Sequence, residues 1–350
     1  MRQSKNNSRA TFVCGWLGAF ALAMTLAIVH SPRTPAQAAK PSKQKIFVPL
    51  PTEVPAPKDN QMTPEKVALG KQLFFDARLS DDNKMSCATC HDPAKAFSDG
   101  LPQAKGRGGK TLGRRTPSLL NVGLYAAYFW DGRAKTLEEL ALQPVQSPDE
   151  MNQNLDELEK KLNAIPGYAK QFQAVFGTKV SRDGIAKALA AFQRTLVTKP
   201  APFDRYLKGE KDALSANAKE GMRLFMGEAG CVQCHRGPLL SDGKYYRLGV
   251  GTGDKGRGAV TKKKEDNFKF RTPSLRNMAP EGPYMHDGSH KTLQDVVTFY
   301  YRGVSTSPIE GLQLDVQPLV GQSFSEIALI VAFLESLSGE GPKITPPELP

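Results

Sequence analysis

The sequence has 350 residues, with 40% hydrophobic and 23% charged side chains, a composition that excludes a disordered or fibrous chain and has room for two globular domains. The formal net charge is +12, but residues 1–38 hold four basic side chains and no acidic one, so the rest carries about +8, from 43 basic and 35 acidic residues. We interpret the lysine triplet at 262–264 as a solvated loop, and no longer segment rich in Lys and Arg occurs. We therefore expect no nucleic-acid partner.

Residues 1–38 are typical of a secretory signal peptide. Basic residues precede a run of 19 mostly apolar residues at 11–29, and an Ala-x-Ala site ends at Ala38, where we expect cleavage. The apolar run can nearly span a bilayer, so an uncleaved membrane anchor is the alternative. Either interpretation predicts an exported protein, with the periplasm as its location and a membrane contact only if the signal is retained.

A helical pattern at 67–76 precedes the sequence "CATCH" at 87–91. The pattern C-x-x-C-H is the attachment site of a c-type haem, in which two thiols bind the porphyrin edge and the following His ligates the iron. The phrases "RTPSLLN" at 115–121 and "FWDGRAKTLEEL" at 129–140 come next. Apolar residues on one face then predict a helix over 181–199, followed by a linker near 199–214.

The second half of the sequence repeats this order. A helical pattern at 218–227 precedes "CVQCH" at 231–235, and "RTPSLRN" at 271–277 and "MHDGSHKTLQDV" at 285–296 both lie 156 residues after their counterparts. A Ser with a Glu three residues later predicts a capped helix over 323–337. A duplication of this length indicates two related domains.

These features predict a mostly α protein with two cytochrome c-like domains, at 39–200 and 201–350, each with one covalently bound haem c. Disulfides or a zinc site could also use four cysteines, but neither requires a His after each second Cys. The expected haem-binding residues are Cys87, Cys90, His91, Cys231, Cys234 and His235, with the two histidines as proximal iron ligands.

The two haem motifs, the stretch "YFWDGRAKTLEELALQPVQSPDEM" after the first and "RTPSLRNMAPEGPYMHDGSHKTL" after the second together resemble the bacterial di-haem cytochrome c peroxidase family, including its MauG group. The resemblance covers roughly residues 60–338. It implies that hydrogen peroxide reacts at the N-terminal haem and that the C-terminal haem passes electrons. It also implies that Trp130 is an electron relay between the haems and that Glu150 is the distal acid and base.

The 156-residue offset pairs Pro144 with Tyr300. In the family, the sixth ligand of the C-terminal haem comes from this region and is Met in the peroxidases and Tyr in the MauG group. No Met follows this segment, so the resemblance implies Tyr300 as the ligand, with Tyr301 as its near rival. Pro144 has no ligating atom, which leaves the first haem open for peroxide.

In the classical peroxidases of the family, a His in the loop after the first haem motif caps the iron of that haem. The corresponding loop here, residues 92–115, contains no His. This departure favours the MauG-like branch. The remaining histidines, His286 and His290, are interpreted as structural hydrogen-bonding residues, and His286 can also lie on the electron path because it mirrors Trp130.

The family holds a calcium ion between its domains with an Asn side chain and backbone carbonyls. The Asn position falls on Arg115 here, and the carbonyl positions fall near Glu281 and Pro283. Calcium binding is therefore an open question at this stage.

Three functions are compatible with the sequence. The first is a peroxidase that receives electrons from a small cytochrome or copper protein. The second is MauG-like oxidation of Trp or Tyr side chains of a partner protein through a high-valent di-haem state. The third is a non-catalytic electron carrier, which would need two six-coordinate haems, contrary to Pro144 and the missing His. We expect an enzyme of the first or second kind.

Overall fold

In the computed structural model, the described residues are 46–251, 253–302, 313–316 and 323–350, so the predicted signal peptide lies outside them. None of the helices in this part of the chain is both long and apolar enough to cross a membrane. Helices dominate, which confirms the predicted fold class. In the same residues the strands form one small sheet, in which β1 (Tyr245–Arg247) pairs antiparallel with β2 (Lys269–Arg271).

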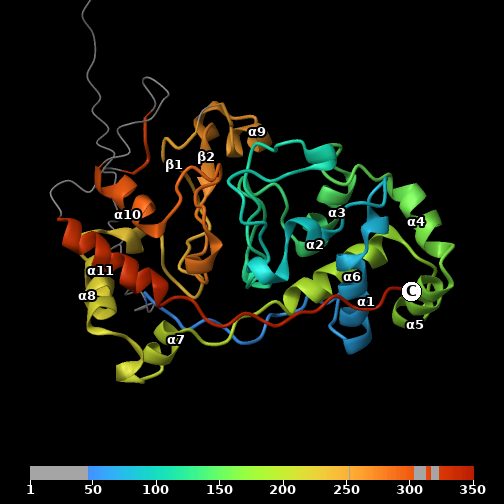
Figure 1. Cartoon of the computed structure of the whole chain (residues 1–350), viewed down its shortest axis with the longest axis horizontal. Coiled ribbons are helices and arrows are strands. Elements are labelled where there is room, and N and C mark those ends of the chain that lie inside the picture. The colour runs from blue at the N-terminus through green and yellow to red at the C-terminus, as the bar shows by residue number, and fades with distance from the viewer. Residues whose placement is uncertain (1–45, 252, 303–312, 317–322) are drawn as a thin grey trace, which may run out of the picture. The chain divides into compact units, whose positions relative to one another are not determined.

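Two separate hydrophobic cores divide the described chain into a first lobe (residues 64–196) and a second lobe (residues 201–337), which Figure 1 shows in blue to green and in yellow to red. The first lobe contains α1 (Pro64–Phe75), α2 (Cys87–Cys90), α3 (Leu137–Gln146), α4 (Leu155–Asn163), α5 (Pro166–Phe176) and α6 (Arg182–Arg194). The second contains α7 (Pro202–Leu207), α8 (Ala216–Met226), α9 (Arg257–Thr261), α10 (Leu293–Arg302) and α11 (Phe324–Glu335). The domain boundaries inferred from the sequence stay predictions.

Each lobe is built on one close helix crossing, of α1 with α6 and of α8 with α11. Gly70 and Gly221, which are equivalent in the two helical phrases before the haem motifs, lie at these crossings. A Cβ atom on either glycine would come within 1.9 Å of a carbonyl oxygen of the facing helix, that of Ala188 or that of Leu329. Glycine is therefore needed for the close approach of the two backbones.

The repeated phrase RTPSLxN fastens the loop that follows each haem motif. In both lobes a serine of the loop donates a hydrogen bond to the carbonyl of the phrase's threonine, and the phrase's serine donates to a loop carbonyl. The bonds are Ser98 Oγ to Thr116 O (2.8 Å), Ser118 Oγ to Ala96 O (2.6 Å), Ser241 Oγ to Thr272 O (2.7 Å) and Ser274 Oγ to Leu239 O (2.9 Å). The phrase is repeated because both lobes need the same fastening.

The first described residues belong to the second core, although the helix they lead to lies in the first lobe. Phe47 packs edge-on against Phe203, with ring centroids 5.2 Å apart. The backbone N–H of Leu50 donates to Asp204 Oδ1 at 2.8 Å, and this carboxylate also pairs with buried Arg276 at 2.9 Å. The segment is thereby anchored to the second lobe before α1 begins.

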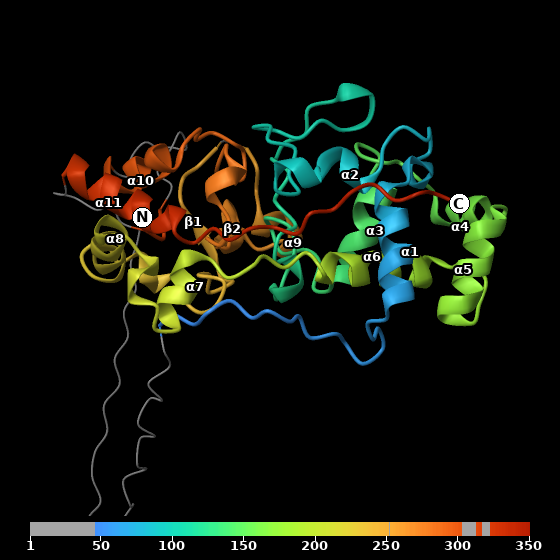
Figure 2. The same cartoon turned by 60° about the horizontal axis from the view of Figure 1, so that its bottom comes forward.

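Residues 339–350 run from the second lobe back along the first lobe, as the red trace in Figure 2 shows. The backbone N–H of Lys199 donates to Glu340 O at 2.8 Å, Gln72 Nε2 donates to Glu348 O at 3.0 Å, and Arg78 Nη1 donates to Pro350 O at 3.0 Å. This strap covers part of the surface next to α1.

We predict that Gly221→Ala destabilises the protein. The added methyl group must push α8 away from α11, and overpacking of this kind costs about 1–3 kcal/mol. Thermal unfolding followed by circular dichroism should show a lower midpoint than in the wild type. Gly113→Ala is the control, because a Cβ at Gly113 meets no atom within 4 Å. Equal midpoints for both variants would contradict the close crossing.

Candidate functional site

A main-chain carbonyl orients the histidine of each haem motif. His91 Nδ1 lies 2.9 Å from Phe97 O, and His235 Nδ1 lies 2.8 Å from Leu240 O. A carbonyl oxygen can only accept, so Nδ1 carries the proton in both rings. The lone pair of Nε2 is then available to a metal, which is the arrangement typical of ligating histidines.

The charge state of the two histidines suits iron ligation. Burial lowers the pKa of His91 and of His235, which favours the neutral imidazole that a metal requires. Burial also raises the pKa of Cys87 and of Cys231 to about 12. The four cysteines of the motifs are free thiols in the described chain rather than disulfides. They also take no part in a cluster of metal-ligating side chains among the described residues.

One continuous cavity of about 1320 Å³ is lined by the cysteines and histidine of both haem motifs. It exceeds the roughly 300–1,000 Å³ of a pocket for one small molecule. Thiol pairs with the attachment spacing, a histidine with a free Nε2 and a cavity of this size fit two covalently attached haems. The expected haem-binding residues therefore lie together around a shared space.

In the first lobe, α3 and the turn after it form part of the cavity wall. Pro144 lies within α3 and lines the cavity with an apolar ring. Glu150 follows in the turn, where its backbone N–H donates to Ser147 O at 3.0 Å. Glu150 also lines the cavity. Burial raises the pKa of Glu150, while a hydrogen bond from Ser147 and the charge of Arg133 oppose the shift.

In the second lobe, α10 forms part of the wall of the same cavity. Tyr300 and Tyr301 both line the cavity, and Tyr301 is also part of the second hydrophobic core. Burial raises the pKa of the Tyr300 phenol, and the thiols of Cys231 and Cys234 add to this shift. Burial also raises the pKa of Tyr301, and the charges of Glu326, Cys231 and Glu228 add to that shift. Tyr300 and Tyr301 therefore both belong to the wall of the cavity that also contains the second haem motif.

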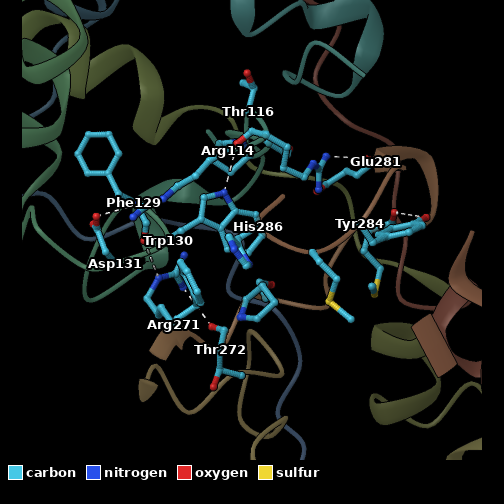
Figure 3. Close-up of a pocket in the computed structure, with 18 of the residues that line it drawn as sticks. Arg114, Thr116, Phe129, Trp130, Asp131, Arg271, Thr272, Glu281, Tyr284 and His286 are labelled. Carbon is cyan, nitrogen blue, oxygen red and sulfur yellow. Dashed lines mark hydrogen bonds and ion pairs between the residues drawn. The ribbon is translucent and has the colours of Figure 1, made fainter. Parts of the chain in front are cut away.

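Trp130 lies where the two lobes meet and is held by both (Figure 3). Its indole Nε1 donates to Arg115 O at 3.2 Å, and its own carbonyl accepts from the backbone N–H of Arg271 at 2.8 Å. Arg115 and Arg271 are the first residues of the two RTPSLxN phrases. These two equivalent residues of the repeats therefore both bind Trp130, Arg115 at its side chain and Arg271 at its backbone.

Charged residues that the sequence analysis did not single out reinforce this junction. Arg114 pairs with Asp131 of the first lobe and with Asp254 of the second, each at 2.7 Å. Arg257 Nη1 donates to the carbonyls of Asp131 and Gly132 at 3.0 and 2.9 Å. The ion pairs of Arg114 thus form a clamp between the lobes. The only feature of the sequence that pointed to this clamp is the position of Arg114 immediately before a repeated RTPSLxN phrase.

The two remaining histidines have packing contacts rather than a shared metal environment. His286 stacks on Phe270 with ring centroids 3.7 Å apart, and its carbonyl accepts from the backbone N–H of Arg115 at 2.9 Å. His290 Nδ1 lies 2.9 Å from Ser289 Oγ, and its ring packs edge-on against Phe299. His286 belongs to the same junction as Trp130, as Figure 3 shows.

Comparison of this chain with known proteins identifies the family of proteins that it resembles. The family model described as di-haem cytochrome c peroxidase matches residues 64–212. The methylamine utilization protein MauG of Methylorubrum extorquens is 46% identical over 86% of this chain and 86% of its own. The cytochrome c551 peroxidase of Pseudomonas aeruginosa is 37% identical over 91% of this chain and 92% of its own.

Solved structures agree with the sequence relatives. A MauG-like protein associated with microbial copper homeostasis has a TM-score of 0.73 at 30% identity and covers 87% of this chain and 96% of its own. The di-haem peroxidase BthA from Burkholderia thailandensis has a TM-score of 0.67 at 26% identity, over 80% of this chain and 87% of its own. The family resemblance predicted from the motifs is confirmed: the chain belongs to the di-haem cytochrome c peroxidase family and is an oxidoreductase of that family.

Proposed function

We propose that this protein is a periplasmic, MauG-like di-haem peroxidase in which hydrogen peroxide is reduced at the site of His91. Each peroxide consumes two electrons and two protons and yields two water molecules. The electrons arrive from a small cytochrome or copper protein through the site of His235. When bound, the two haems supply the redox-active iron, and the residues of the chain determine what each iron can do.

The observation that carries this proposal is the difference between Pro144 and Tyr300. Both lie in the helix that follows the repeated phrase xDGxxKTL, and both line the shared cavity. Pro144 offers no donor atom, so the site of His91 keeps a free face for peroxide. Tyr300 offers a phenol oxygen, which can close the site of His235 and favour its oxidised forms.

Glu150 is proposed to move the proton that cleavage of the O–O bond requires. A carboxylate above the open face can accept a proton from the inner peroxide oxygen and return it to the outer one. Burial raises the pKa of Glu150 above its usual range, which makes the protonated half of this transfer easier than for an exposed carboxyl group.

Trp130 is proposed to carry electrons between the two sites. An indole is readily oxidised, and hydrogen bonds from both lobes hold this one at the junction. The stacked pair of Phe270 and His286 lies on the second-lobe side of the same junction and adds further π-systems to the path.

Oxidation of Trp or Tyr side chains in a partner protein is the second candidate function. Identity to the MauG of Methylorubrum extorquens, at 46%, exceeds identity to the cytochrome c551 peroxidase, at 37%. The loop at 92–115 has no His that could cap the first site, and the segment that carries Tyr300 has no Met, nor does the sequence after it. A long-lived two-electron-oxidised state after one equivalent of peroxide, quenched only by a protein partner, would favour this function over peroxide reduction by a small donor.

Tyr300→Phe should remove the low-spin signal of one ferric haem in electron paramagnetic resonance spectra of the holoprotein. The phenol oxygen is the proposed sixth ligand, and Phe has the same ring without it. Tyr301→Phe is the matched control and should keep the signal. The ligand assignment is wrong if the Tyr301 variant loses the signal and the Tyr300 variant retains it.

Glu150→Gln should slow the reaction with peroxide by about 10²–10⁴-fold, because the amide cannot accept a proton. The wild-type rate should fall as the pH falls through the raised pKa of Glu150, and this dependence should disappear in the variant. Stopped-flow absorbance measures both effects. Exposed Glu157→Gln is the control, and an unchanged rate in the Glu150 variant would exclude the proposed role.

Trp130→Phe should leave both haem spectra intact and slow electron transfer between the two sites. Phenylalanine fills most of the volume of the indole but is much harder to oxidise. To measure the rate, the haem at the second site is reduced rapidly and the absorbance of the haem at the first site is monitored. A variant with wild-type transfer would show that electrons take another path.

A further inference from the structure

Arg115 places a buried positive charge at the junction of the two lobes. Its side chain is almost fully enclosed, with 5% of the residue exposed. The guanidinium Nη2 donates to the main-chain carbonyl of Glu281 at 2.5 Å and lies 3.4 Å from Ser98 Oγ. Since Ser98 belongs to the first lobe and Glu281 to the second, this one cation joins the two.

The backbone of the same residue holds the aromatic junction. The N–H of Arg115 donates to His286 O at 2.9 Å, and its carbonyl accepts the indole N–H of Trp130 at 3.2 Å. The side chain and the backbone of Arg115 therefore fix the second lobe, Trp130 and His286 relative to one another. A displacement of this guanidinium would be transmitted directly to Trp130.

The resemblance to the family raised the possibility of a calcium ion at this place, and the residues here do not fit one. Calcium requires six to eight oxygen ligands. The side chain at the expected Asn position is a cation, and the carbonyl of Glu281 already accepts from that cation. No group of three or more metal-ligating side chains occurs in the described part of the chain. A divalent ion at this carbonyl would be repelled by the guanidinium.

The surrounding charges suit a permanent cation instead. The carboxyl groups of Glu281 and Asp99 act on Arg115, and burial raises the pKa of Glu281 to about 7 while the guanidinium opposes that shift. Burial lowers the pKa of Arg115, but arginine stays protonated in proteins. Its Nε atom is buried and has no partner among the described residues, so a donor remains for an anionic group in the cavity that Arg115 lines.

We propose that the guanidinium of Arg115 is a built-in cation that takes the place of a metal ion between the lobes, so that the alignment of Trp130 with the two haem sites does not depend on calcium. The positive charge that joins the lobes is then covalently part of the chain. It cannot be lost by chelation or at low calcium concentration.

The first test uses the wild-type holoprotein and does not measure turnover. After dialysis against EGTA, elemental analysis should find substoichiometric calcium. The thermal midpoint and the electron paramagnetic resonance spectra of both haems should be the same in EGTA as in excess calcium chloride. One tightly held calcium per chain, or a spectrum or midpoint that changes on chelation, would overturn the proposal.

The second test replaces the cation. Arg115→Asn supplies an amide in place of the guanidinium and should lower the thermal midpoint in EGTA and broaden the haem signals. Arg115→Lys keeps a positive charge and should recover much of both losses. Arg107→Asn, on the exposed part of the same loop, is the matched control for loss of an arginine and should behave like the wild type.

An Arg115→Asn protein with wild-type midpoint and spectra in EGTA would contradict the role of the cation. If this variant does not fold, the Arg115→Lys variant decides the same question. Wild-type midpoint and spectra in the lysine variant support a role for the charge, and a lysine variant that also fails to fold would overturn a role based on charge alone. The calcium content of the wild type is decisive independently of either variant.

Discussion

The hydrogen bond from a histidine Nδ1 to a main-chain carbonyl is the interaction on which both sites depend. It selects the tautomer in which Nε2 is free, and it sets the plane of the imidazole ring in the cavity. The accepting carbonyls belong to loops, which would be mobile without further support. Serine bonds between these loops and the RTPSLxN phrases supply that support in both lobes. Polar contacts of the RTPSLxN phrases therefore help to determine where an iron ligand points.

A nearly symmetric frame carries a few asymmetric side chains, and these account for the different behaviour proposed for the two sites. The crossing glycines, the serine fastenings and the oriented histidines occur once in each lobe. In the alignment of the two repeats, Trp130 is equivalent to His286, and Pro144 is equivalent to Tyr300. Arg115 and Arg271 are also equivalent, yet one holds the indole of Trp130 and the other holds its backbone. Duplication supplied two equal sites, and substitution at a few positions made them unequal.

The motifs predicted the helical fold, the family and the residues around the cavity because these depend on local spacing. C-x-x-C-H fixes two thiols and an imidazole within five residues, and the 156-residue offset aligns Pro144 with Tyr300 without any structure. The clamp of Arg114 with Asp131 and Asp254 could not be predicted in this way, because Asp254 lies 140 residues away in a glycine-rich loop with no repeat mate. The same limit applied to Arg115. Its sequence position raised the question of calcium, but only the 2.5 Å contact with Glu281 O shows what the side chain binds.

The strap formed by residues 339–350 has a consequence for how the duplicated protein can be assembled. The surface beside α1 is completed by Glu348 and Pro350, which are translated long after the first lobe. The packing of the first lobe is therefore complete only when this last segment has been made. A chain truncated between the two repeats would contain a first lobe that lacks this cover.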